Sequence, residues 1–146
     1  MTALTNYTEN KLIDHIFRGQ TFTAPTNLYV GLYTANPSDT GGGTEVTGGS
    51  YARVTVACSL ANWAGTQSAG STVASSGTGG TTSNNGAITF PSPTANWGTI
   101  TGVGVFDASS AGNLLWWSAL TVNKTVNNGD PAPSFPAASL TFQIDD

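Results

Sequence analysis

The sequence predicts a mainly β protein, an antiparallel β-sandwich of jelly-roll-like design with one short N-terminal α-helix. Several short apolar segments alternate with period two and are bounded by Gly, Asn or Pro, as in the strands of a sandwich. Strand-like and helix-like segments do not alternate along the chain, which disfavours a parallel α/β fold. The 146 residues match the usual size of one domain and contain no internal repeat, so we expect a single domain over 1–146.

The N-terminal segment 1–20 contains the one stretch with helical spacing. Asn6 is expected to cap the helix, with Glu9 three residues later in a capping-box-like pattern, and Gly19 offers a left-handed stop. About three turns are too short to be stable alone, so the helix must pack on a sheet or on a neighbouring subunit. Its apolar face would present Leu12, Ile13, Ile16 and Phe17.

After Gly19 the apolar pattern changes to strand spacing. The expected strands are 28–33, 51–60, 88–90, 97–107, 113–120 and 140–144. Residues 65–86 consist almost entirely of Gly, Ser, Thr, Ala and Asn. Such a stretch is expected to bury no core face and to form a long exposed loop or β-arm.

The composition restricts the possible partners. Only 8% of the residues are charged, against about 25% in an average soluble domain. A Thr- and Ser-rich surface loses little side-chain entropy when it is fixed, which suits permanent protein contacts. The net charge of −4 and the lack of a basic stripe argue against nucleic acid as a partner. No apolar run approaches the ~20 residues of a membrane span, and no signal peptide is predicted.

The reactive side chains predict no catalytic residue and no cofactor. His15 is the only histidine and is expected at the surface or in an interface, because no serine lies in a nucleophile-elbow motif. Cys58 is the only cysteine, and it shares strand parity with Val54 and Val56, which predicts a buried thiol. One His and one Cys do not make a zinc site.

Calcium is the one metal that the acids could suit, since it binds carboxylate and carbonyl oxygens. The acids in or beside loops lack calcium-loop spacing, so we interpret them as turn-forming residues and predict no metal site; they are Asp39, Glu45, Asp107 and Asp130.

The aromatic side chains admit two interpretations. Trp116 and Trp117 follow each other in one expected strand and therefore point to opposite faces, which places at least one outside the core. They could stack on sugar rings together with Trp63, Trp97, Tyr7, Tyr29, Tyr33 and Tyr51. Without a partnering charged or amide-rich group in the sequence nearby, core or protein-interface roles are favoured. Gly102 and Gly104 are expected to permit close packing or a bend within a strand.

The order of several short motifs resembles a family of small structural proteins of tailed bacteriophages. The motifs are LTNYTENKLIDH (4–15), LYVGLYT (28–34), GGSYARV (48–54), ITFP (88–91), NWGTI (96–100), GVFD (104–107) and GNLL (112–115). The resemblance implies a β-sandwich-like, non-enzymatic protein and brings no catalytic residues to carry over. The chain departs from the family pattern mainly in 65–86 and in the proline-rich 130–136.

The resemblance and the composition together predict a non-enzymatic virion protein, made in the cytoplasm of the host bacterium. The leading hypothesis is a capsid decoration (cement) protein, which binds the major capsid protein and copies of itself and stabilises the assembled head by mass action. The alternatives are a tail or tail-fibre component that contacts host surface glycans, and a carbohydrate-binding module. The candidate interface residues are Leu12, Ile16, Phe17, Trp116, Trp117, Pro131 and Phe135, with 65–86 as an arm that could add a strand to a neighbour.

Overall fold

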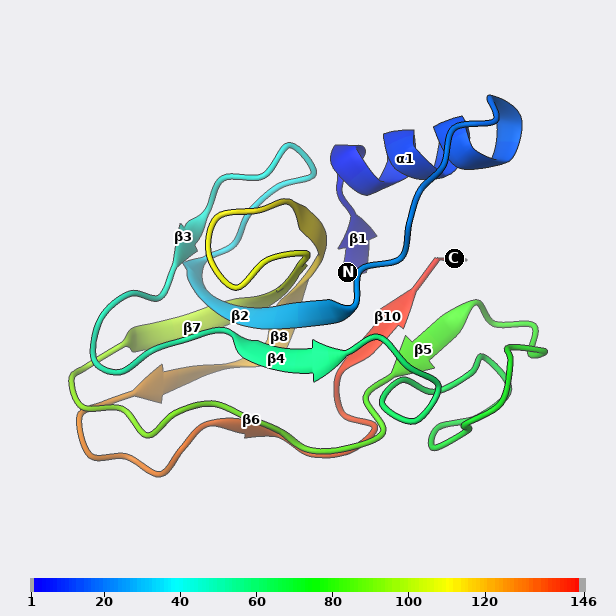
Figure 1. The fold of residues 1–146 in the computed structure, drawn as a ribbon. Coiled ribbons are helices and arrows are strands. Elements are labelled where there is room, and N and C mark those ends of the chain that lie inside the picture. Colours follow the sequence, from blue (N-terminus) through cyan, green and yellow to red (C-terminus); the bar gives the residue numbers. More distant parts are fainter. Residues whose placement is uncertain (1, 145–146) are drawn as a thin grey trace.

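The computed structural model describes residues 2–144 and has one helix and ten strands within that range. In chain order they are β1 (Thr2–Leu4), α1 (Asn6–Phe17), β2 (Asn27–Ala35), β3 (Thr44–Glu45), β4 (Val54–Ala57), β5 (Thr81–Ser83), β6 (Ile88–Thr89), β7 (Gly98–Phe106), β8 (Leu114–Val126), β9 (Ser134–Phe135) and β10 (Thr141–Gln143). The expectation of a mainly β fold with one short N-terminal helix is confirmed (Figure 1).

One large antiparallel sheet organises the molecule. Its strand order is β1-β8-β7-β2-β3. On the edge of β2 that faces away from β7, β3 pairs with the C-terminal half of β2 and β4 pairs with its N-terminal half. In the central β2–β7 ladder, Gly31 lies directly opposite Gly104. The long strand β8 carries the next ladder, in which Trp117 is the partner of Gly104. The pairing therefore brings two glycines and a tryptophan into one row across the middle of the sheet.

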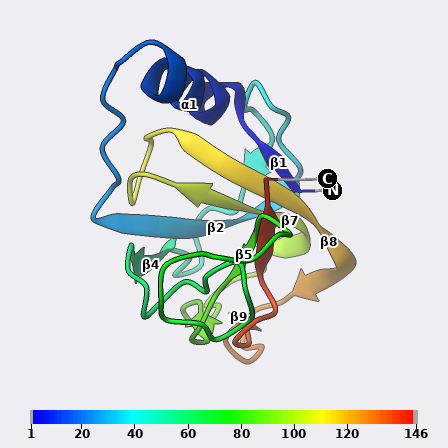
Figure 2. The same cartoon turned by 90° about the vertical axis from the view of Figure 1, so that its right-hand side faces the viewer.

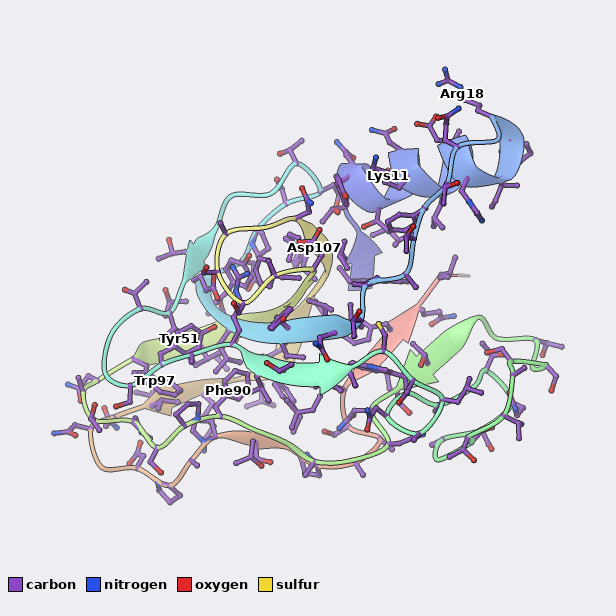
Figure 3. All side chains as sticks on the ribbon, viewed as in Figure 1. Lys11, Arg18, Tyr51, Phe90, Trp97 and Asp107 are labelled. Atoms are coloured by element: carbon purple, nitrogen blue, oxygen red, sulfur yellow. The ribbon has the colours of Figure 1, made fainter. Side chains whose placement is uncertain are left out.

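Two small antiparallel sheets, β5–β10 and β6–β9, cover one face of the large sheet and complete a β-sandwich-like arrangement (Figures 1 and 2). The core lies between them, because apolar residues of both layers belong to one buried cluster. The cluster consists of Val30, Leu32, Val46, Ile88, Phe90, Trp97, Ile100, Val103, Val105, Val126, Leu140 and Phe142. Aromatic rings close one end of this core, where Tyr51 contacts Phe90 and Trp97 at centroid distances of 6.2 and 5.4 Å (Figure 3).

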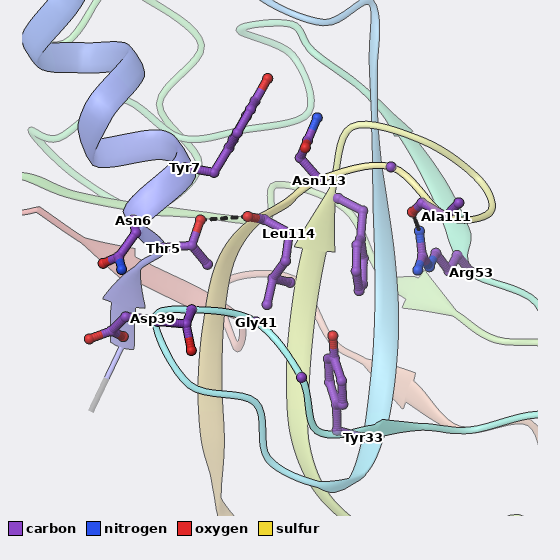
Figure 4. Close-up of a pocket in the computed structure, with 14 residues that line it drawn as sticks. Thr5, Asn6, Tyr7, Tyr33, Asp39, Gly41, Arg53, Ala111, Asn113 and Leu114 are labelled. Carbon is purple, nitrogen blue, oxygen red and sulfur yellow. Dashed lines mark hydrogen bonds between the residues drawn. The ribbon is translucent and has the colours of Figure 1, made fainter.

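The face of β2 that looks away from this core carries the other strand parity. Val30 and Leu32 face the core, so Gly31 and Tyr33 lie on the outer face. The outer face is covered only locally, by the loops that follow β2 and β7 and by the start of α1 (Figure 4). Tyr33 is nevertheless only 4% exposed. Residues of the large sheet are thus buried on both faces, in the apolar core on one face and under the covering loops on part of the other.

The helix follows the prediction in extent but not in its cap. Gly19 adopts φ +68°, which confirms the left-handed stop. The N-cap, however, is Thr5, and Asn6 is the first helical residue. The prediction that Asn6 caps the helix was wrong, because the Thr5 N–H bonds to the carbonyl oxygen of Leu115 and thereby fixes the chain one residue earlier. No helix among residues 2–144 has the length and apolar character needed to cross a membrane.

The prediction that 65–86 buries no core face was wrong for the end of that segment. It contains β5, and Asn84 is only 1% exposed. The Asn84 amide donates to the carbonyl oxygens of Gly86 and Pro136, both at 2.8 Å, and its side-chain oxygen accepts the Leu140 N–H at 2.9 Å. A polar segment can be buried when each of its polar groups finds a partner, and the composition alone does not show such partners.

Candidate functional site

A polar pocket of about 420 Å³ lies on the outer face of the large sheet (Figure 4). Its walls come from the start of α1, the turn that follows β2, and the loop between β7 and β8. The lining residues are Thr5, Asn6, Tyr7, Tyr33, Asp39, Thr40, Gly41, Gly42, Arg53, Phe106, Ala111, Gly112, Asn113 and Leu114. We call it the outer-face pocket.

Two stacked aromatic rings form the floor of the outer-face pocket. Tyr33 and Phe106 lie 6.2 Å apart between centroids, with 23° between their planes. A Cβ at Gly104 would lie 2.8 Å from both Tyr33 Cε2 and Leu114 Cδ1. The rings can therefore lie against the sheet only because position 104 lacks a side chain, which agrees with the predicted close packing at Gly104.

Tyr33 lines the pocket, and Figure 4 shows its hydroxyl pointing toward the side on which Leu114 and Asn113 lie. Among residues 2–144 no hydrogen bond engages this hydroxyl. Burial, and next the negative charge of Glu45, raise the pKa of Tyr33 to about 12. The floor of the pocket therefore presents a neutral phenol, which can both donate and accept a hydrogen bond.

One wall is built around Arg53, whose side chain is 7% exposed. Its Nε and Nη2 donate to the two carboxylate oxygens of Glu45 at 2.8 and 2.7 Å. Its Nη1 donates to the carbonyl oxygens of Ala108 and Ala111 at 2.7 and 2.8 Å, and its guanidinium lies 3.3 Å from the ring centroid of Phe106. Four donors and the charge of Arg53 are thus engaged within the protein, so this wall is close to neutral.

The loop acids divide into two groups when their contacts are compared. Asp107 accepts the Asn113 N–H and Asp130 accepts the Asn127 N–H, each at 2.7 Å, as expected of turn-forming acids. The same prediction was wrong for Glu45, which serves as the ion-pair partner of Arg53. Among residues 2–144 no group of three or more His, Cys, Asp or Glu side chains is placed to hold a metal ion.

The remaining wall combines the start of α1 with the turn after β2. The Thr5 hydroxyl donates to the carbonyl oxygen of Leu114, so it does not cap the helix. The Asn6 N–H bonds to the Asp39 carbonyl oxygen at 2.9 Å and joins the helix to the turn. The side chains of Asn6 and Asp39 are both exposed and lie on the same side of the pocket in Figure 4. Of these two, only the Asp39 carboxylate has a partner in residues 2–144, Trp117 Nε1 at 3.4 Å.

The two adjacent tryptophans of β8 point to opposite faces of the large sheet, as predicted. Trp117 lies on the outer face beside Asp39. Trp116 points into the sandwich, 5.8 Å from Phe142, and lines an apolar pocket of about 320 Å³ together with Trp63. The buried Nε1 atoms of Trp63 and Trp116 have no hydrogen-bond partner in the described part of the chain.

The other candidate interface residues lie at two ends of the molecule. On α1, Ile16 is 66% and Phe17 is 80% exposed, whereas Leu12 is half-buried. Pro131 is exposed, but Phe135 is half-buried in β9 and its ring lies 6.3 Å from that of Phe90. In Figure 2, α1 is at the top and β9 at the bottom, so the structure does not bring these residues into one surface.

The prediction of a buried Cys58 thiol was wrong. Cys58 is exposed, because β4 ends at Ala57 and the alternation of the strand no longer applies one residue later. Partial desolvation beside the apolar pocket raises the pKa of the thiol. His15 is exposed, as expected, with its Nδ1 within 3.3 Å of the Phe22 N–H and 3.1 Å of the Gln20 carbonyl oxygen.

Sequence reasoning named Tyr7 and Tyr33 as possible sugar-stacking residues but did not place them in one pocket. It missed the contributions of Arg53 and Asn6. Strand parity places Gly31 and Tyr33 on the face opposite Leu32, but the turn-rich segments 36–43 and 107–112 give no sign in the sequence that they fold over that face.

The fold and this pocket define a small β-sandwich-like module with a loop-covered outer face. The sequence model of the family described as podophage GP4 fiber I protein gp80 matches residues 3–143. The chain therefore belongs to this family of tailed-phage virion structural proteins, and a virion location follows. No curated protein matches the chain.

Proposed function

We propose that this protein is a non-enzymatic structural component of a phage fibre, which works by binding neighbouring virion proteins and the host surface. The match to a fibre protein family over residues 3–143 carries the proposal. It favours the tail-fibre alternative over the capsid-decoration hypothesis.

Two structural features support a binding role. Ile16 and Phe17 leave apolar surface exposed on α1, and such surface is typical of contacts between proteins. The outer-face pocket gathers two tyrosines, two asparagines and an aspartate, which form a polar and aromatic surface without a catalytic constellation. The Thr- and Ser-rich composition is suited to being fixed in an assembly at a small entropic cost.

The test is to locate the protein in particles of the phage that encodes it. Gold-labelled antibodies against this chain are expected on the fibres, and quantitative mass spectrometry should give a copy number in the range of the other fibre proteins. Labels distributed over the head, with copies in proportion to the major capsid protein, would instead establish the capsid-decoration role.

A further inference from the structure

We propose that the outer-face pocket binds a neutral saccharide, with the Tyr33 hydroxyl at its floor and the Asn6 and Asp39 side chains at its rim. The existence of this site does not depend on where the protein sits in the particle. Its biological source, a polysaccharide of the bacterial surface, rests on the proposed fibre function.

The Tyr33 hydroxyl at the floor of the pocket is available to a ligand. The residue as a whole is only 4% exposed, and no hydrogen bond engages its hydroxyl in the described part of the chain. The hydroxyl oxygen itself is not among the buried atoms without a partner, so it reaches solvent and can bond to water. A ligand hydroxyl can replace that water, since it can serve as donor or as acceptor toward a neutral phenol.

The rim supplies complementary groups within the same pocket. The Asp39 carboxylate only accepts hydrogen bonds, and its single contact to Trp117 Nε1 is long, at 3.4 Å. The Asn6 amide can donate and accept, and no hydrogen bond engages it in residues 2–144. Neighbouring hydroxyls of a sugar ring offer both functions side by side. The half-buried Tyr7 ring also lines the pocket and offers an aromatic face to sugar C–H groups.

The charges in and around the pocket disfavour other ligand classes. An anion would meet the Asp39 carboxylate, and the positive charge of Arg53 is already paired with Glu45 at 2.7 Å, which leaves Lys11, with its Nζ 5.7 Å from the ring centroid of Tyr7, as the cation that could attract it. The net charge of −4 adds a further repulsion. A metal ion would require more carboxylates than Asp39 provides. The volume of about 420 Å³ lies within the ~300–1,000 Å³ range of small-molecule sites.

The experiment is a titration of the ¹⁵N-labelled chain, followed by NMR, with methyl glycosides of neutral hexoses, 6-deoxyhexoses and N-acetylhexosamines. Sodium sulfate and methyl glucuronide serve as anionic probes, and purified neutral polysaccharide from the host as the polymeric one. We expect at least one neutral glycoside to shift the backbone resonances of Tyr7, Asp39 and Gly41 in a saturable manner, with a dissociation constant of the order of 1 mM.

The variant Tyr33→Phe removes the hydroxyl and keeps the ring, so the fold should persist and the amide spectrum of the core should be retained. Binding is expected to weaken by about threefold to tenfold, the range of one hydrogen bond. Tyr29→Phe is the matched control, because it deletes a hydroxyl from the same strand outside the pocket. It should bind like the unchanged protein.

Three outcomes would overturn the proposal: no shift with any neutral glycoside or polysaccharide, unchanged affinity in Tyr33→Phe, or tighter binding of the anionic probes. Each is distinguishable from a failure of the proposed fibre function. If antibodies label the fibres but the chain binds no saccharide, only the proposed saccharide site is refuted. If the chain binds a saccharide but the labels lie on the head, only the proposed fibre function is refuted.

Discussion

The two faces of the large sheet bury their residues by different means. On the core face, Val30, Leu32 and Val103 are at most 3% exposed and pack against the two small sheets. On the outer face, one strand position away, Gly31 and Gly104 lie opposite each other. Their missing side chains leave space that Tyr33, Phe106 and the Arg53–Glu45 pair occupy.

This difference shows how one strand can serve two purposes. The core face gains stability from apolar area removed from water, which needs no particular orientation. The outer face depends on directional contacts, since Arg53 is held by three different residues. The core face therefore contributes mainly stability, while the outer face fixes a set of polar groups in place.

The largest effect is expected on the core face. Leu32→Ala removes most of a side chain that is 3% exposed and should lower the free energy of unfolding by about 3 kcal/mol. Urea denaturation measures it. Val122→Ala, at a side chain that is 78% exposed, is the control and should change little. Equal losses at both positions would contradict the assigned core.

A smaller loss is expected when the charged pair of the outer face is broken. Arg53→Met removes the cation that pairs with Glu45, leaves only the Tyr51 hydroxyl to donate to that carboxylate, and leaves two carbonyl groups without their donor; it should cost about 2 kcal/mol. The value is below that of a fully buried pair, because the Glu45 side chain is 24% exposed. The double variant Arg53→Met with Glu45→Gln should recover part of the loss. A double variant that is less stable than Arg53→Met would refute the pairing argument.

The glycine row can be tested by adding a single methyl group. Gly104→Ala places a Cβ 2.8 Å from Tyr33 and Leu114 and should destabilise the protein by about 1–2 kcal/mol. Gly86→Ala is the matched control, since a Cβ there meets no atom within 4 Å. If both variants unfold at the same urea concentration, the floor of the pocket does not require a glycine.

The buried phenol predicts a dependence of stability on pH. Its pKa is raised to about 12 from 10, so the unfolded chain loses the proton first as pH rises. Stability from Tyr33 is present below pH 10 and is lost between pH 10 and 12, by about 1 kcal/mol at pH 11. Tyr33→Phe should flatten this decline in alkaline urea titrations. The raised pKa of Tyr51 predicts a second such decline, which Tyr33→Phe should retain.

The smallest effect on stability is expected on α1. Phe17→Ser changes a side chain that is 80% exposed and should alter the free energy of unfolding by no more than about 0.5 kcal/mol. If α1 contacts a fibre neighbour, the variant should nevertheless be incorporated into particles less efficiently than Val122→Ser. A large loss of stability in Phe17→Ser would show that the helix end is part of the core.

The sequence predicted well whatever depends on local periodicity. The alternation of Leu28, Val30 and Leu32 predicted β2 and its core face. Because Trp116 and Trp117 are consecutive residues of one strand, it was also predictable that their side chains point to opposite faces of the sheet. The strands that it missed, β1, β3, β5 and β9, have two or three residues and owe their pairing to distant partners. Such segments carry too few residues for a period to be visible.

The candidate site was less predictable, because its parts come from four separate stretches of the chain. Tyr33 and Arg53 are 20 positions apart in the sequence. Asn6 is brought to them by the β1–β8 pairing, by the bond from its own N–H to Asp39, and by the bonds from Thr5 to strand β8. The burial of Asn84 could not be predicted from the sequence either, since its hydrogen-bond partners at Gly86, Pro136 and Leu140 come together only in the folded chain.

The two margins of the large sheet differ in how much strand they leave unpaired. One margin is shared by β3 and β4, of two and four residues. At the other margin β1 pairs only with residues 116–118 of β8, so β8 continues past it to Val126, and among residues 2–144 no strand pairs with that stretch of edge. An edge of this length is a template to which a strand of another chain can add. Lys124 lies in it, and a lysine on an edge strand is one of the features by which native sheets resist such pairing.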